Sequence, residues 1–137
     1  LSLAGLKERI PASVQGKDLS AFMEDKSTNE NAPKGVLYIR NVDGNKDENG
    51  NVLDYLPVAR GVKTERYTLA ITIDRKNSIK DILVFEDKND PYQRNNLTGK
   101  GHKKAFDSVC KLMTTLLKQA DDPWYRNRIL SEILLYD

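Results

Sequence analysis

Hydrophobic and polar positions along the chain predict a β-sheet followed by two helices. Residues 35–42 and 52–58 are rich in β-branched and aromatic side chains, and a polar turn over residues 43–51 would join them. Residues 64–74 alternate regularly, which is the period of a half-buried strand. One face of this strand would carry Tyr67, Leu69, Ile71 and Ile73. After a turn at residues 75–78, residues 79–86 are predicted to return as a fourth strand.

The C-terminal third predicts two amphipathic helices, over residues 101–122 and 122–136. The first has apolar residues at the three- and four-residue spacing of one helix face. They are Phe106, Val109, Cys110, Met113, Leu116 and Leu117. The stripe of the second helix consists of Trp124, Ile129, Leu130, Ile133 and Leu134. Pro123 suits the first position of a helix, so it separates the two.

The N-terminal residues are less regular. Residues 1–10 fit a short helix or an irregular strand that ends at Pro11, and residues 18–26 fit one or two helical turns. The length of 137 residues predicts a single domain over residues 1–137. Within it, residues 1–34 would form an N-terminal segment, residues 35–98 the sheet and residues 101–136 the helices.

The amino-acid composition limits the functions that the chain could have. Hydrophobic residues make up 39% and charged residues 31%, which is typical of a folded soluble protein. Charges appear too early for the core of a signal peptide. A single cysteine, Cys110, rules out an intrachain disulfide, and a single histidine, His102, leaves little material for a catalytic triad. These features favour a protein that is not an enzyme and that has no metal or cofactor.

Two predicted loops contain residues that could bind a calcium ion or an anion, but in each case a simpler interpretation is favoured. Residues 45–52 resemble a fragment of a calcium loop, yet Leu56 stands where a bidentate glutamate is needed, so a solvated turn is favoured. Residues 98–104 place glycines and lysines before a helix, where an anion could bind, but the P-loop spacing is absent. His102 is predicted to be exposed. Cys110 lies on the apolar stripe and is predicted to be a buried structural thiol.

The polar face of the sheet suggests a nucleic-acid surface. Cations, hydroxyls and an aromatic ring on one face could meet the phosphates and unpaired bases of RNA. The candidate RNA-binding residues are Tyr38, Arg40, Arg66, Thr68, Thr72 and Lys80. The alternative is an ordinary solvated sheet face.

The order of elements is similar to that of coat proteins of the small single-stranded RNA bacteriophages. The resemblance rests on residues 35–57, 66–74 and 105–136. It implies an α+β fold with an antiparallel sheet of about five strands followed by two C-terminal helices, intertwined in a homodimer. Dimers would assemble into an icosahedral shell around viral RNA, in a virion built in the bacterial cytoplasm. The dimer interface would contain Phe106, Val109, Met113, Leu117, Trp124, Leu130 and Ile133.

The physical pattern agrees with assembly but leaves alternatives open. Two apolar helix faces exceed what one four-stranded sheet can cover, and a large uncovered apolar surface predicts an interface. The fifth strand would have to come from the N-terminus or from residues 91–98. A small non-capsid RNA- or single-strand-binding regulator would suit the same surface. Residues 67–86 also resemble flavin-binding lipoprotein domains, although their threonine-rich attachment motif is absent.

Overall fold

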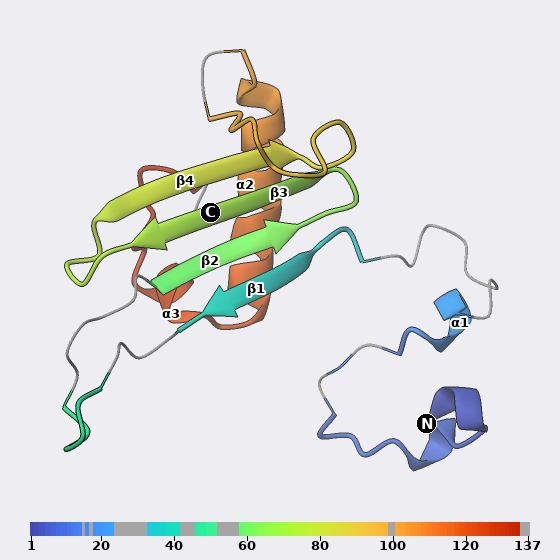
Figure 1. Cartoon of the computed structure of the whole chain (residues 1–137). Coiled ribbons are helices and arrows are strands. Elements are labelled where there is room, and N and C mark those ends of the chain that lie inside the picture. The colour runs from blue at the N-terminus through green and yellow to red at the C-terminus, as the bar shows by residue number, and fades with distance from the viewer. Residues whose placement is uncertain are drawn as a thin grey trace. The chain divides into compact units, whose positions relative to one another are not determined.

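A four-stranded antiparallel sheet with one long helix across one face forms the larger of two units in the chain (Figure 1). The computed structural model describes residues 1–14, 16, 18–23, 33–41, 46–51, 58–98 and 101–134. The two units are Leu1–Pro33 and Lys34–Asp137. The single-domain organisation stays a prediction. None of the described helices is long and apolar enough to cross a membrane.

The described residues of the first unit include three short helical segments, and a short helix was one of the two alternatives that the sequence left open for residues 1–10. They are the 3-10 turns Ser2–Ala4 and Lys7–Arg9 and the helix α1, Ser20–Met23. The Asp18 carboxylate accepts hydrogen bonds from the Ser2 hydroxyl at 2.7 Å and from the Ser20 amide at 3.0 Å. These bonds lower the pKa of Asp18 to about 2. Large apolar side chains stay exposed in this unit, among them Leu1 and Met23.

The sheet of the second unit is a meander. Its strands are β1 (Val36–Arg40), β2 (Val58–Lys63), β3 (Tyr67–Ile73) and β4 (Ile79–Glu86). They pair in chain order. The predictions for β3 and β4 are confirmed, and the alternate residues Leu69, Ile71 and Ile73 are buried. An α+β arrangement is therefore confirmed at the level of a four-stranded sheet and a C-terminal helix. The fifth strand is not found among the described residues.

The second strand lies further along the chain than predicted. β2 begins at Val58, where the prediction ends, and residues 52–57 lie outside the described part. Asp47 closes the turn of residues 47–51 locally, because its carboxylate accepts hydrogen bonds from the Asn49 and Asn51 amides. The pairing of β2 with β1 starts only at Ala59, which lies opposite Arg40. The hairpin thus has a longer connection than a tight Asn-Gly turn would give.

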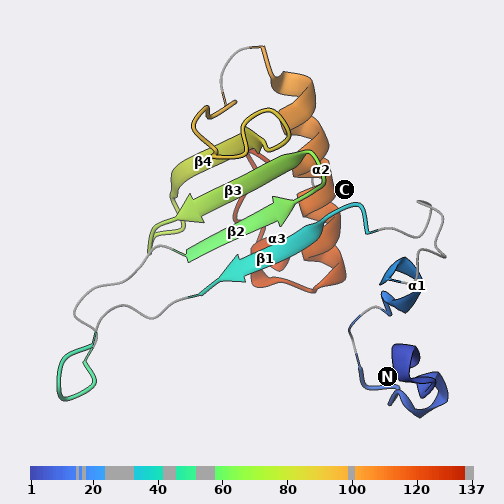
Figure 2. The same ribbon diagram turned by 45° about the vertical axis from the view of Figure 1, so that its right-hand side comes forward.

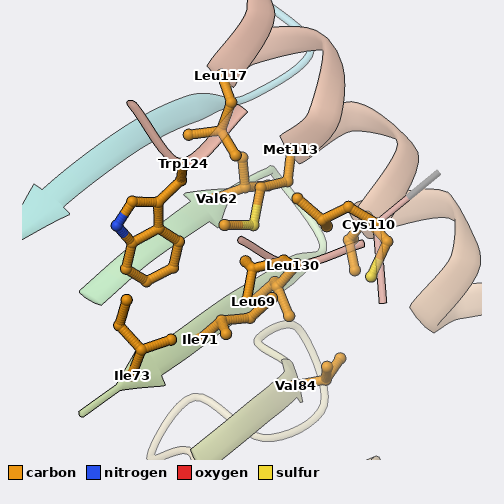
Figure 3. Packing of buried hydrophobic residues seen from close by; sticks show 12 residues of the cluster. Val62, Leu69, Ile71, Ile73, Val84, Cys110, Met113, Leu117, Trp124 and Leu130 are labelled. Carbon is orange, nitrogen blue, oxygen red and sulfur yellow. The ribbon is translucent and has the colours of Figure 1, made fainter. Parts of the chain in front are cut away.

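Helix α2, Lys103–Gln119, packs its apolar stripe across one face of the sheet (Figure 2). Figure 3 shows how Met113 and Leu117 from this helix meet Val62 and Leu69 from the strands. The stripe predicted for the first helix is confirmed as a core-facing surface. Burying it on the sheet is what anchors the helix, since packing stabilises helices more than propensity does.

The second predicted helix is much shorter than expected. Helix α3 is only Pro123–Arg126, with Asp122 as its N-cap and Pro123 in its first turn. Arg128 then adopts a left-handed backbone conformation with φ 49°, which a continuous α-helix does not allow. Successive turns follow, and they still bury Leu130 and Leu134. The apolar stripe was therefore correctly located, but turns present it instead of a helix.

Candidate functional site

Four of the six predicted RNA-contacting residues share one face of the sheet. The register places Tyr38, Arg40, Thr68 and Thr72 on the face opposite α2. Arg66 lies in the turn before β3 and not in the strand. Lys80 lies beside an irregularity of the β3–β4 register between Thr72 and Ile73.

Internal partners occupy several of these polar groups. Arg66 Nε donates to Glu86 Oε1 at 2.7 Å, and its guanidinium lies 5.0 Å from the centre of the Tyr67 ring. The Thr68 hydroxyl donates to Asp87 at 2.8 Å, and Lys63 Nζ lies 2.7 Å from the same carboxylate. This end of the sheet thus carries a cross-strand network of partly exposed charges.

Tyr38 covers the glycine beside it in the sheet. Gly61 is the register partner of Tyr38, and a methyl group added there would overlap the tyrosine ring and lie 2.6 Å from the Leu69 carbonyl oxygen. Burial raises the pKa of the Tyr38 hydroxyl, while Arg40 acts in the opposite direction. The ring therefore rests on the strand surface, and its packing explains why position 61 holds glycine.

Most residues of the predicted dimer interface lie in the core of the described unit. Five are buried there: Val109, Met113, Leu117, Trp124 and Leu130. The other two, Phe106 and Ile133, are partly buried against the same core. The sheet covers more of the apolar stripes than the sequence analysis assumed, because β2 and β3 both face α2. The homodimer stays a prediction.

A buried ion pair connects the sheet to α3, and its cation, Arg60, was not among the predicted site residues. Arg60 Nε lies 3.0 Å from Asp122 Oδ2, and both side chains are 4% exposed. Arg60 also donates to the Asn41 side chain at 2.8 Å, and its guanidinium lies 4.9 Å from the centre of the Trp124 ring. Asp122 additionally accepts a hydrogen bond from the Trp124 amide at 2.8 Å. Arg60 lies just beyond the strand predicted for residues 52–58, so nothing in the local pattern marked it as a buried charge, which requires a partner.

A hollow of about 500 Å³ lies between α2 and the β2–β3 turn. We call it the lysine hollow. Its polar lining comprises Lys34, Thr64, Ser108, Lys111 and Thr115. Its apolar lining comprises Tyr67, Val109 and Leu112. An apolar floor with a few polar groups is the usual character of a ligand site.

The structure describes several of the residues that the sequence suggested as an ion site, and also the single thiol. Among the described residues, no group of three or more His, Cys, Asp or Glu side chains could hold a metal ion. The Asp47 carboxylate is used by the turn, consistent with a solvated turn. Burial, followed by the charge of Asp107, raises the pKa of Cys110 to about 12. Cys110 is thus the buried thiol that was predicted, and His102 is exposed as predicted.

Comparison with known proteins places the chain beside sulfatases. It is 46% identical over 137 residues to an endo-4-O-sulfatase of Bacteroides thetaiotaomicron, covering 99% of this chain and 27% of the relative. It is 31% identical over 108 residues to an ulvan-active sulfatase of Formosa agariphila, covering 72% of this chain and 17% of that protein. No family model matches.

The fold agrees with that comparison. A solved Bacteroides thetaiotaomicron structure, from work on the metabolism of multiple glycosaminoglycans, superimposes with a TM-score of 0.82 at 46% identity. The match covers 99% of this chain and 28% of the solved one. The chain therefore spans about a quarter of the length of the endo-4-O-sulfatase and of this solved structure.

These comparisons overturn the functional predictions. The resemblance to phage coat proteins is wrong, and so are the capsid, RNA-binding and virion assignments that it implied. The alternative RNA-binding regulator has no support either. The expectation of a non-enzymatic protein is also wrong, because the relatives are named sulfatases, which are enzymes. A sheet followed by terminal helices recurs in unrelated families, so the order of elements did not define one.

Proposed function

We propose that this chain is part of a polysaccharide sulfatase that hydrolyses sulfate esters on a glycosaminoglycan-type polymer. The observation that carries this proposal is the 46% identity to an endo-4-O-sulfatase, which extends over 99% of the chain. A match that includes the whole sheet, α2 and the first unit goes beyond a shared motif. The 4-O position is taken from the name of that relative, and the glycosaminoglycan class is taken from the work that describes the matching solved structure. Both belong to the proposal.

Exposed apolar side chains support the view that this chain is one part of a larger enzyme. In the first unit, Leu1 is 62% exposed and Met23 is 74% exposed. In the second unit, Val36 and Ile39 on β1 are 60% and 49% exposed. Val36 and Ile39 lie on opposite faces of the edge strand β1, so each face of this strand has an exposed apolar side chain that another protein surface could cover. In this proposal, other segments of the sulfatase cover these residues.

Sulfate release from defined polysaccharides tests the proposal. The protein that carries this chain, in its full encoded length, would be incubated with 4-O-sulfated chondroitin, 6-O-sulfated chondroitin and ulvan. We expect free sulfate, measured by ion chromatography, from the 4-O-sulfated polymer and much less from the 6-O-sulfated one. Release from ulvan alone would keep the sulfatase but change its substrate class. The absence of sulfate release from all three polymers would refute the proposal.

A further inference from the structure

Two lysines line the lysine hollow, and neither is paired with an acidic side chain among the described residues. Lys34 and Lys111 are both exposed and line the hollow. Within the described part of the chain, neither lysine forms an ion pair. Asp107, the acidic residue nearest to Lys111 in α2, is already paired with Lys103 at 2.9 Å. Two lysines that no described carboxylate neutralises make this part of the surface attractive to an anion.

Helical spacing extends the cationic surface beyond the hollow. Lys104 and Lys111 are seven residues apart, so they share one face of α2 at a separation of about 10 Å along its axis. Two residues stand between them on that face: Ser108, which is exposed, and Asp107, whose carboxylate is paired with Lys103. Charges repeated along a helix face, with a hydroxyl between them, suit a polymer whose anionic groups also repeat.

The walls of the hollow are held in place by the fold. The Thr64 hydroxyl accepts hydrogen bonds from the Tyr67 amide at 2.7 Å and from the Arg66 amide at 3.2 Å, which fixes the β2–β3 turn. Gly35 lets the start of β1 approach α2, because an added Cβ would lie 2.9 Å from Leu112 Cδ2. This close approach brings the backbone at Lys34 next to the helix that carries Lys111. The two lysines come from distant parts of the sequence, and only the packing of β1 on α2 unites them.

We infer that the lysine hollow, together with Lys104, is a subsite for the sulfate or carboxylate groups of an anionic polysaccharide. The inference rests on the proposed function for the choice of ligand. Lys34 and Lys111 would bind the anionic groups, Ser108 would donate a hydrogen bond, and the apolar floor at Val109 and Leu112 would meet the carbon faces of a sugar ring. Glu65 follows Thr64 in the chain but does not line the hollow.

A charge-matched pair of variants tests this inference in the full-length protein. One variant combines Lys34→Ala with Lys111→Ala, and the control combines Lys76→Ala with Lys80→Ala at the opposite end of the sheet. Both remove two exposed positive charges. Affinity for 4-O-sulfated chondroitin and for chemically desulfated chondroitin would be measured by isothermal titration calorimetry at two salt concentrations. The melting temperature of each variant would show that it folds.

We expect the hollow variant to bind the sulfated polymer about tenfold more weakly, and the control to change much less. Salt should reduce the difference between them, because screening weakens exposed charges. Lys34→Arg with Lys111→Arg should retain binding. Should the alanine pair unfold, the single charge reversal Lys111→Glu would take its place. Equal affinity of the hollow variant and wild type would overturn the inference.

The same measurements separate the two proposals. Wild-type protein that releases no sulfate and binds no sulfated polymer would refute the proposed function. Wild-type protein that releases sulfate while the hollow variant binds and hydrolyses the polymer normally would refute only the subsite. If the subsite is correct, the hollow variant should show a raised KM on the polymer and an unchanged KM on a monosaccharide sulfate.

Discussion

Gly61 and Tyr38 show how a single position can be determined by its cross-strand neighbour. Gly61 is buried under the Tyr38 ring, and the Leu69 carbonyl oxygen closes the same space from β3. Glycine normally weakens a strand, and it is retained where another group approaches the backbone closely. Here that group is an aromatic ring from the adjacent strand.

Gly61→Ala should destabilise the protein by about 1–3 kcal/mol, because neither the ring nor the carbonyl can yield freely. Urea denaturation would measure the change in the free energy of unfolding. In the Tyr38→Ala background the same substitution should cost less, since the ring is gone. The control is Gly16→Ala, where an added methyl group meets nothing within 4 Å. A Gly61→Ala variant as stable as the control would contradict this account.

At the scale of elements, one carboxylate connects β2 to the start of α3. Asp122 caps α3 through the Trp124 amide and neutralises Arg60, and both charged side chains are buried. Such a pair adds little net stability compared with apolar residues, but removing one member leaves the other charge buried alone. The connection between helix and sheet therefore depends on both residues together.

Asp122→Asn should lower the free energy of unfolding by about 3 kcal/mol or more, since Arg60 loses its counter-charge. Asparagine can still cap the helix, so the loss reports on the ion pair. The matched control is Asp121→Asn next to it, whose exposed pair with Arg126 should be worth less than about 1 kcal/mol. Urea denaturation of both variants would measure the two losses in the free energy of unfolding. Equal losses in the two would show that burial of the pair is not what matters.

At the scale of the whole molecule, the carboxylates at the end of β4 make stability depend on acid pH. Hydrogen bonds from Arg66 lower the pKa of Glu86. Burial raises the pKa of Asp87, but hydrogen bonds from Lys63, Gln93 and Thr68 outweigh it, and the net pKa is lowered. A carboxylate whose folded pKa is depressed stabilises the protein above its unfolded pKa and loses that contribution as the pH falls.

Stability should therefore be nearly constant from pH 7 to about pH 5 and fall as the pH drops below the ordinary values of 4.5 for Glu86 and 3.8 for Asp87. Urea midpoints measured between pH 7 and pH 3 would show this decline. In Asp87→Asn the decline should be shallower, because one titrating group is missing. A midpoint that stays constant down to pH 3 would mean that these bonds do not stabilise the fold.

Much of the fold could be predicted because its signals are local. The alternation in residues 67–73 and the stripe of α2 each repeat within a few residues, and β3, β4 and α2 follow them closely. The position of β2 could not be read in this way. Its segment Val-Ala-Arg-Gly-Val-Lys shows no simple alternation, because Arg60 points into the core and Gly61 makes room for a ring.

Local patterns along the chain were enough to locate the strongly periodic elements, the buried position of Cys110 and the apolar face of α2. The partner of Arg60, which is 62 residues away, and the meeting of Lys34 with Lys111 in one hollow follow only from how the chain folds. The physical reason is the distance along the chain over which each signal acts. Periodicity reports which face of one element is apolar, whereas ion pairs and ligand sites depend on which distant elements packing brings together. The same limit explains why an order of elements suggested the wrong family, while identity along the whole chain revealed the relatives.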